Sequence, residues 1–225
     1  MKILIVLLFL LSPLKKVENV QLYFLSDQNE IFLNYSNGNF SQRVFPKKDR
    51  IIAETKNLNF LDIDLNFRII LDSTYINGLD IRLKDLVLDL FDYNLDNYMK
   101  NISGFLNKSI RYSDNGFPQD ALSVLINKKA NCIGFSNLVV ELLYSVGIES
   151  RFIKGFHLEN KRDRVMIPIP HRWIEILLSN GFKYFYDPQY QNFSSGYIIV
   201  KNNVDFSKVK KFKVHLLKKS SEIIN

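Results

Sequence analysis

Three residues whose types suit nucleophilic acyl chemistry follow one another along this chain. Cys132 is the only cysteine among the 225 residues, and His171 and then Asp187 follow it on predicted strands. A thiol can attack a carbonyl carbon, a histidine can take up and return the proton, and a carboxylate can hold the imidazole in one tautomer. The order therefore predicts Cys132 as nucleophile, His171 as base and Asp187 as orienting acid.

A helix is predicted to begin at Cys132. Apolar residues recur after it at spacings of three and four, the period of an amphipathic helix: Phe135, Leu138, Val139, Leu142, Leu143 and Val146. Asn131 is a suitable N-cap and Gly147 a suitable stop. A thiol in the first turn lies at the positive end of the helix dipole, which favours the thiolate. A lone cysteine is also typical of a small buried apolar residue, so the histidine and the aspartate must decide between the two interpretations.

His171 and Asp187 are predicted to lie on the two strands of one hairpin, around the turn Ser179-Asn180-Gly181. A two-residue loop would put Asp187 opposite Ile174, on the other face from His171. A three-residue loop with a left-handed Gly181 puts Asp187 opposite Trp173, on the face of His171. Catalysis therefore predicts the three-residue loop.

The segments around these residues together resemble the transglutaminase-like superfamily. They are Asn131-Cys132-Ile133-Gly134-Phe135-Ser136, Gly147-Ile148-Glu149-Ser150-Arg151-Phe152-Ile153-Lys154-Gly155, His171-Arg172-Trp173 and Asp187-Pro188. The resemblance covers residues 95–190 and implies an α+β fold with a papain/transglutaminase-like core, in which a Cys-bearing helix packs on an antiparallel sheet. It implies the same three roles for Cys132, His171 and Asp187, and a structural role for Arg151 and Gly155.

The oxyanion hole is less well defined by the sequence. The backbone N–H of Cys132 is one candidate donor, and the side chains of Tyr112 and Gln119 are further candidates. Trp173 is expected either to shield the histidine–aspartate pair from water or to fill the core. The charged insertion at 160–164 is predicted to form a surface loop that borders the cleft.

The chain opens with an apolar segment. The run from Ile3 to Leu11 precedes Ser12-Pro13, as in a signal peptide, and is too short to span a bilayer comfortably. No Ala-x-Ala motif follows, and Lys15-Lys16 place positive charge on the unexpected flank. Residues 1–16 are predicted to be a signal peptide, with an anchor through residues 3–14 or a buried first strand as alternatives. The predicted location is therefore extracytoplasmic, either periplasmic or secreted.

Residues 17–80 are predicted to form a β-rich region, and residues 81–225 the transglutaminase-like domain with a basic C-terminal segment. Three short apolar runs, with a hairpin signal at Asn37-Gly38, predict strands at 21–25, 30–35 and 40–45. Alternation at residues 61–67 continues into the more apolar stretch 68–71, which predicts a further strand. The period then becomes helical over about 83–91 and 95–107.

Composition predicts a folded protein but selects no partner. Hydrophobic residues make up 47%, and the net charge of +7 favours anionic surroundings. Lysines and arginines are scattered until the segment from Lys208 to Lys219, which is interpreted as a solvated strand and tail rather than a contact with anionic lipid or polymer. We predict no nucleic-acid partner, and an association with a membrane or the cell envelope stays open.

The sequence offers no pattern of metal ligands. A single cysteine excludes an internal disulfide and a cysteine-rich metal site, and His157, His171 and His215 lie far apart along the chain. We predict no metal and no cofactor, and interpret His157 and His215 as structural.

Three functions remain open on these residues. The first is hydrolysis of a peptide or carboxamide bond in a protein or peptide substrate, by a cysteine peptidase or amidohydrolase. The second is amine transfer from the same acyl-enzyme, which would cross-link proteins. The third is a binding or assembly module in which the three residues are not catalytic. The complete Cys–His–Asp set favours an enzyme, and hydrolysis is the first prediction.

Overall fold

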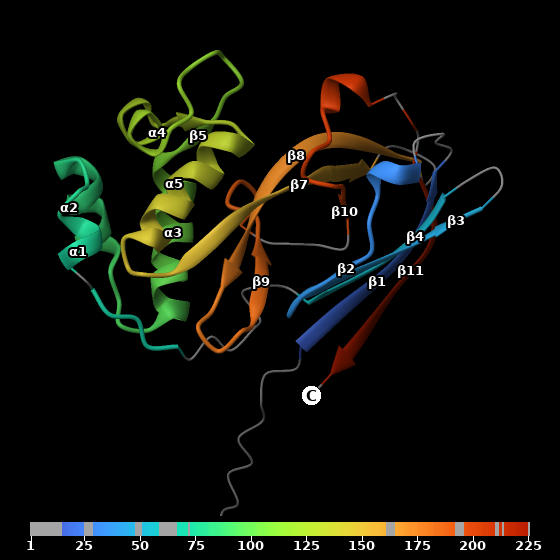
Figure 1. The fold of residues 1–225 in the computed structure, drawn as a ribbon, viewed down its shortest axis with the longest axis horizontal. Coiled ribbons are helices and arrows are strands. Elements are labelled where there is room, and N and C mark those ends of the chain that lie inside the picture. The colour runs from blue at the N-terminus through green and yellow to red at the C-terminus, as the bar shows by residue number, and fades with distance from the viewer. Residues whose placement is uncertain are drawn as a thin grey trace, which may run out of the picture.

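The computed structural model describes residues 15–24, 29–47, 51–58, 67–71, 73–160, 165–191, 196–209, 212 and 214–224 (Figure 1). Within these ranges the strands are β1 (Lys15–Phe24), β2 (Tyr35–Ser36), β3 (Phe40–Pro46), β4 (Ile51–Leu58), β5 (Arg111–Tyr112), β6 (Lys129–Ala130), β7 (Glu149–Asn160), β8 (Val165–Leu177), β9 (Lys183–Tyr186), β10 (Tyr197–Ile199) and β11 (Val214–Ile224). The helices are α1 (Ser73–Ile76), α2 (Ile81–Leu90), α3 (Leu95–Ser109), α4 (Ala121–Asn127) and α5 (Cys132–Tyr144), with 3-10 turns η1 (Asn29–Ile31) and η3 (Phe206–Lys208).

An antiparallel sheet extends through most of the described strands. Nine of them are hydrogen-bonded in the order β10-β7-β8-β11-β1-β4-β3-β2, with β9 paired to β8. β1 pairs with β11 from Lys15↔Ile224 to Phe24↔Val214, and β11 reaches β8 through Val214↔Met166. The N-terminal strands therefore share one sheet with the strand that carries His171. The division into a region at 17–80 and a domain at 81–225 stays a prediction.

The helices gather at one end of the sheet, beside β8 and β9 (Figure 1). The helices expected over 83–91 and 95–107 are confirmed as α2 and α3, and Asn94 caps α3 by accepting a hydrogen bond from the Asn97 N–H. A buried cluster joins Leu138 and Leu142 of α5 to Ile174 and Ile176 of β8. This apolar contact fixes the Cys-bearing helix on the sheet, because such burial stabilises the folded state by about 25 cal/mol per Å² of apolar surface.

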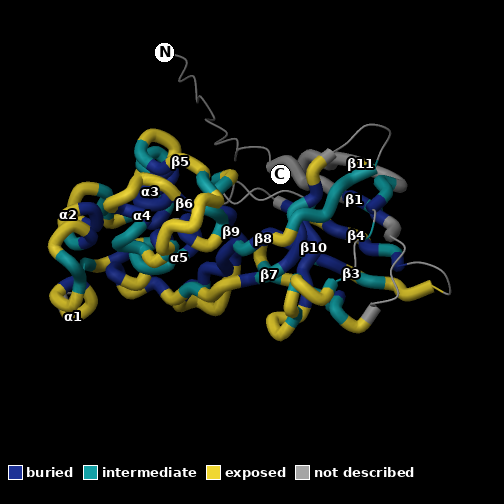
Figure 2. The backbone as a smooth tube through the Cα atoms, turned by 90° about the horizontal axis from the view of Figure 1, so that it is seen from above, coloured by how far each residue is buried: buried dark blue, intermediate teal, exposed yellow. Residues whose placement is uncertain are grey.

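A second buried cluster holds the N-terminal strands against the rest of the sheet. Leu22 of β1 and Ala53 of β4 pack with Phe156 of β7, Ile198 of β10 and Val214 of β11. Figure 2 shows buried backbone running from the helices through β8 to β4. Buried residues therefore extend along the molecule in separate apolar clusters.

Arg151 has a structural role that fits the expectation from the resemblance. It is the cross-strand partner of Glu175, and its Nε donates to Glu175 Oε2 at 2.7 Å. The fully buried Glu175 also accepts from the Tyr35 hydroxyl and, at 2.9 Å, from Asn37 Nδ2. Because buried carboxylates require such partners, this ion pair fastens the β2–β3 hairpin to β7 and β8.

Two strand predictions in the N-terminal half are wrong. Residues 30–35 form the turn η1 and only the first residue of β2, while Phe32 makes a single bridge to Val200. Residues 68–71 form no strand, because Ile69 N–H bonds to the Tyr93 carbonyl before α3 and not to a neighbouring strand. The hairpin at Asn37-Gly38 is confirmed by the β2–β3 pairing.

Several predictions fall on residues that the structure does not describe. The apolar segment at 3–14 lies outside the described residues, as do residues 61–66 and the insertion residues 161–164. In the part of the chain that is described, no helix is both long and apolar enough to cross a membrane.

Candidate active site

Cys132 is the first residue of α5, as its sequence predicts. Asn131 caps the helix, since its Oδ1 accepts from the Ile133 N–H at 2.9 Å and the Gly134 N–H at 3.3 Å. The Asn131 carbonyl accepts from the Phe135 N–H at 2.9 Å. These three bonds engage the second, third and fourth N–H groups of the helix and leave out the first, which belongs to Cys132. The role of this N–H as a donor to the oxyanion of a bound substrate stays a prediction.

The hairpin of β8 and β9 has the predicted three-residue loop. Its ladder runs from Ile174↔Tyr186 to Leu177↔Lys183, and the Gly181 N–H donates to the Leu178 carbonyl at 2.9 Å. Gly181 has a φ of +85°, the left-handed conformation that glycine adopts without strain. One further step along this register puts Asp187 opposite Trp173. The expected face for the carboxylate is therefore confirmed.

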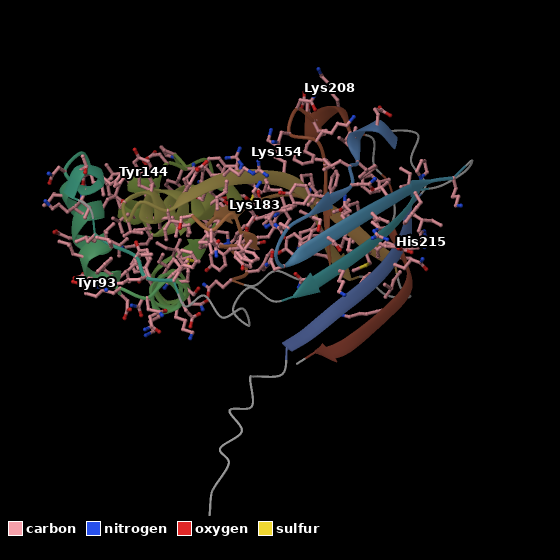
Figure 3. The ribbon with its side chains drawn as sticks, turned by 60° about the horizontal axis from the view of Figure 1, so that its bottom comes forward. Tyr93, Tyr144, Lys154, Lys183, Lys208 and His215 are labelled. Carbon is pink, nitrogen blue, oxygen red and sulfur yellow. The ribbon has the colours of Figure 1, made fainter. Side chains whose placement is uncertain are left out.

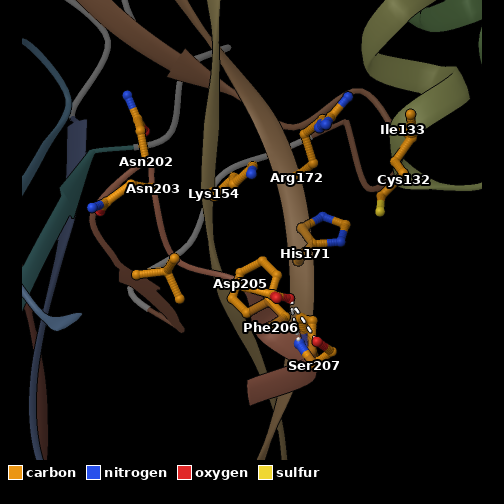
Figure 4. A pocket seen from close by; sticks show the side chains of 12 residues that line it. Cys132, Ile133, Lys154, His171, Arg172, Asn202, Asn203, Asp205, Phe206 and Ser207 are labelled. Atoms are coloured by element: carbon orange, nitrogen blue, oxygen red, sulfur yellow. Dashed lines mark hydrogen bonds between the residues drawn. The ribbon is translucent and has the colours of Figure 1, made fainter. Parts of the chain in front are cut away.

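His171 and Asp187 form a short contact inside the protein. His171 Nε2 lies 2.6 Å from Asp187 Oδ2, and the two residues are 5% and 0% exposed. Figure 4 shows the Cys132 sulfur beside the His171 ring. Because Nε2 contacts Asp187, Nδ1 is the ring nitrogen that can interact with this sulfur. The Ser136 hydroxyl also donates to the Arg172 carbonyl at 3.4 Å, which ties the first turns of α5 to β8.

Asp187 accepts hydrogen bonds on both of its oxygens. Besides His171, the Tyr197 hydroxyl donates to Oδ2 at 2.5 Å. The backbone N–H groups of Gln189 and Tyr190 donate to Oδ1 at 2.9 and 3.4 Å. Tyr197 was not among the predicted site residues, because its apolar strand signals only a buried β10 and nothing in the local sequence indicates a polar partner.

The surroundings of His171 favour its protonated form. Burial by itself would lower the pKa of His171, but hydrogen bonds to Asp187 and to Cys132, together with their charges, raise this pKa from 6.5 to about 9. A positively charged imidazolium beside a thiol favours the thiolate, which is the reactive nucleophile.

The raised pKa of His171 predicts a pH-dependent stability. Its protonated form stabilises the fold fully below about pH 6.5, the unfolded value, and this contribution is lost as the pH rises through about 9. We expect the free energy of unfolding of a Cys132→Ala variant, which removes the thiol titration, to fall as the pH rises above about 6.5. The fall should end below pH 9, because the hydrogen bond and charge of Cys132 no longer raise the pKa of His171. Urea denaturation at each pH measures it. The matched double variant Cys132→Ala/His171→Gln should lack the fall, and an identical pH profile in both would contradict the prediction.

His157, interpreted as structural, packs beside the site. Its ring centroid lies 4.5 Å from that of Tyr190, 5.0 Å from Tyr197 and 5.8 Å from His171. Burial, and then the charge of His171, lower the pKa of His157. A neutral ring therefore fills the space behind the histidine–aspartate pair.

The two side chains predicted as oxyanion donors lie next to the start of α5. Tyr112 pairs with Ala130, and its hydroxyl donates to Asp114 Oδ2 at 2.6 Å. Gln119 Oε1 accepts from the Asn131 N–H at 3.0 Å, and its Nε2 donates to the Phe117 carbonyl at 2.9 Å. Both side chains are thus engaged with neighbouring residues, and their role as oxyanion donors stays a prediction.

Trp173 is fully buried beside His171. It belongs to an apolar cluster with Ile153, Phe185 and Tyr197, and its ring lies 6.2 Å from that of His171. Gly155, which pairs with His171 across the strands, leaves room for this ring. A Cβ at Gly155 would lie 2.1 Å from the Ile198 carbonyl oxygen and 2.5 Å from Trp173.

Gly155→Ala is expected to lower the free energy of unfolding by about 2–4 kcal/mol, because backbone on one side and the indole on the other must shift. Urea denaturation measures the change. Gly104→Ala in α3 is the matched control, since a Cβ there meets nothing within 4 Å. That variant should be more stable by about 0.5–1 kcal/mol. Equal effects of the two substitutions would contradict the steric explanation.

A pocket of about 550 Å³ opens onto Cys132 and His171. Figure 4 shows its lining side chains. They come from the start of α5, from β7 and β8 and from the loop that contains η3: Cys132, Ile133, Lys154, Pro170, His171, Arg172, Asn202, Asn203, Val204, Asp205, Phe206 and Ser207. The thiol is therefore accessible from a pocket large enough for several residues of a peptide. Among the described residues, no group of three His, Cys, Asp or Glu side chains is placed to hold a metal ion.

Known proteins resemble this chain in sequence family and in fold. Residues 92–188 match the family model of the transglutaminase-like superfamily. The crystal structure of a candidate cysteine protease from Cytophaga hutchinsonii has a TM-score of 0.50 and 12% identity, over 94% of this chain and 89% of that chain. The periplasmic domain of TgpA from Pseudomonas aeruginosa has a TM-score of 0.49 and 12% identity, over 77% of this chain and 70% of that chain. No curated protein matches the sequence.

The comparisons agree with the prediction made from the four segments. The matched range 92–188 contains Cys132, His171 and Asp187. At 12% identity the Cytophaga structure shows a shared fold alone. The predicted α+β class, with a Cys-bearing helix on an antiparallel sheet, is confirmed, and residues 92–188 match the family model of the transglutaminase-like superfamily.

Proposed function

We propose that this protein is a cysteine-dependent hydrolase of peptide or carboxamide bonds, with Cys132 as nucleophile, His171 as base and Asp187 as orienting acid. The observation that carries the proposal is the buried 2.6 Å contact between His171 Nε2 and Asp187 Oδ2, with the other ring nitrogen left for Cys132. The match of residues 92–188 to the transglutaminase-like superfamily supports thiol-dependent chemistry in general.

The first half of the reaction forms an acyl-enzyme. The Cys132 thiolate attacks the carbonyl carbon, and the negative charge moves to the carbonyl oxygen, where the Cys132 N–H can donate a hydrogen bond. When the C–N bond breaks, the leaving nitrogen takes the proton from His171 Nδ1. The products are a thioester on Cys132, a free amine or ammonia, and a neutral imidazole.

The second half returns the enzyme to its starting state. His171 removes a proton from water, and the hydroxide attacks the thioester carbonyl. Breaking the C–S bond releases a carboxylic acid and the Cys132 thiolate beside the imidazolium. Asp187 keeps Nε2 protonated in both halves, so that Nδ1 is the nitrogen that exchanges the proton.

Alkylation of the single cysteine tests activation of the nucleophile. At pH 6, iodoacetamide is expected to label Cys132 far faster than a free thiol, because the imidazolium holds the sulfur as thiolate. Mass spectrometry of the intact chain measures the rate, and the Cys132→Ser variant is the control for labelling elsewhere. A rate no faster than that of a free thiol would contradict the proposal and favour a binding or assembly module.

Hydrolysis and amine transfer share the thioester intermediate and differ in whether water or an amine attacks it. Trapping the acyl-enzyme from a cell-envelope extract by mass spectrometry would identify the acyl donor. Ammonia release and incorporation of an added primary amine should then be assayed together on that donor. Release without incorporation supports hydrolysis, and stoichiometric incorporation assigns the protein to protein cross-linking.

We also propose an extracytoplasmic location, which the apolar segment at 3–11 supports. Residues 1–16 would act as a signal peptide, and the β-rich region 17–80 would accompany the domain 81–225 to the envelope. Fractionation of cells followed by N-terminal sequencing tests both points. Recovery of an uncleaved chain in the cytoplasm would contradict them.

A further inference from the structure

Two cationic side chains line the pocket next to the reacting residues. Lys154 of β7 and Arg172 of β8 are direct cross-strand partners, one step from the pair Gly155↔His171. Both side chains line the same pocket as Cys132 and His171 (Figure 4). Two cationic residues therefore line the pocket that opens onto the thiol.

Lys154 and Arg172 carry like charges at opposed positions of neighbouring strands. Like charges directly opposite each other on neighbouring strands destabilise a sheet. Within the described residues neither Lys154 nor Arg172 makes an ion pair. The Arg172 guanidinium lies 5.0 Å from the centre of the Phe152 ring, a contact that supports the side chain and leaves its N–H groups for other partners.

The acidic residue of the pocket does not neutralise the two cations. Asp205 Oδ1 accepts from the Ser207 N–H at 3.0 Å and from its hydroxyl at 2.7 Å. Asp205 Oδ2 lies 3.7 Å from Lys208 Nζ. Because the Asp205 carboxylate is occupied at the start of η3, the positive charge of Lys154 and Arg172 stays available to a ligand.

We propose that Lys154 and Arg172 bind a carboxylate of the substrate, next to the carbonyl that Cys132 attacks. The inference rests on the proposed function and names the substrate class, which is an acidic peptide or carboxamide. A guanidinium and an ammonium side by side suit a carboxylate, which arginine can bind through two parallel hydrogen bonds. The carboxylate can belong to an aspartate or glutamate side chain or to a free C-terminus.

The test compares two alkylating reagents that differ in charge. Iodoacetate is anionic and iodoacetamide neutral, and both modify the one cysteine of the chain. The rate with iodoacetate divided by the rate with iodoacetamide reports the attraction of anions to the pocket, because the reactivity of the thiol affects both rates alike. Lys154→Gln and Arg172→Gln are each expected to lower this ratio about three- to tenfold, because each removes one positive charge near the sulfur.

Two controls separate charge from structural damage. Arg172→Lys keeps the charge and should keep the ratio close to that of the unmodified protein. Lys183→Gln removes an exposed lysine that lies outside the pocket lining and should leave the ratio unchanged (Figure 3). An unchanged ratio in both pocket variants overturns the proposal. Slow alkylation by both reagents at pH 6 would instead contradict the proposed function.

Short peptides then identify the source of the carboxylate. Acetyl-Ala-Glu-amide carries the acid in a side chain, acetyl-Ala-Gln carries a free α-carboxylate, and acetyl-Ala-Gln-amide is neutral. At millimolar concentration one or both acidic peptides should slow iodoacetamide labelling of Cys132 more than the neutral peptide does. The more protective acidic peptide reveals the source. Equal protection by all three, or protection by neither acidic peptide, overturns the proposal.

Discussion

His171→Ala is expected to lower the rate of Cys132 alkylation by iodoacetamide at pH 6 by about 100-fold. An ordinary thiol with a pKa near 8.5 is ionised to only about 0.3% at that pH. In the intact site, hydrogen bonds and charges raise the pKa of His171 to about 9, so its ring is charged at pH 6 and stabilises the thiolate. Without the ring, the first-turn position on α5 is the remaining feature that favours the thiolate.

Turnover should fall further than alkylation does, by about 10³–10⁴-fold, since His171 also protonates the leaving nitrogen and activates water. His215→Gln is the matched control, because His215 lies on β11 away from the helical end of the molecule (Figure 3). In that variant Cys132 should be alkylated at the same rate as in the protein without substitutions. An alkylation rate for His171→Ala within threefold of the unmodified protein would show that the helix start alone activates Cys132.

The elements that position the three residues could be predicted because their signals are local. The apolar spacing after Cys132 and the cap at Asn131 each involve residues within about one helical turn of each other. The length of the loop Ser179-Asn180-Gly181 could be predicted from the alternation of side chains along the strands, because a register shift of one residue moves Asp187 to the other face of the sheet. A left-handed glycine then fixes the register that brings Asp187 to His171.

The parts that could not be predicted depend on pairing between distant segments. Tyr197 meets Asp187 only because β10 pairs with β7, and Lys154 faces Arg172 only in one register of β7 and β8. The central place of β11 between β1 and β8 is equally non-local. Apolar runs at 30–35 and 68–71 resemble strands, yet their backbone groups find partners in turns and isolated bridges. Outside a hairpin, local pattern carries no information on which partner a strand will have.

The second large effect concerns the carboxylate that holds the histidine. Asp187→Asn is expected to lower turnover by about 10³–10⁴-fold, although the side chain keeps its size. The site offers the carboxylate four donors: His171 Nε2 and the Tyr197 hydroxyl on one oxygen, and two backbone N–H groups on the other. An amide has one oxygen, which accepts, and one NH₂, which donates. On one side of the site the NH₂ must therefore face groups that donated hydrogen bonds to the carboxylate.

The backbone N–H groups cannot reverse, which decides the orientation of the amide. Its oxygen stays on them and its NH₂ points at His171 Nε2, which must then give up its proton and accept. The remaining ring proton moves to Nδ1, facing Cys132, and this tautomer cannot take the thiol proton. The pKa of His171 should also fall, because burial lowers it and the hydrogen bond and charge of Asp187 no longer raise it.

The alkaline limb of the activity profile should therefore move from about pH 9 to lower pH in Asp187→Asn, since the charged ring is lost earlier as the pH rises. Rates of Cys132 alkylation across pH 5 to 10 report the loss of the charged ring without a known substrate, because a thiolate that the imidazolium no longer stabilises forms only at higher pH. Tyr197→Phe is the matched comparison, because it removes one donor and keeps the carboxylate, and it should cost no more than about tenfold. If both variants lose activity equally with unchanged pH profiles, Asp187 acts only through packing and the tautomer argument fails.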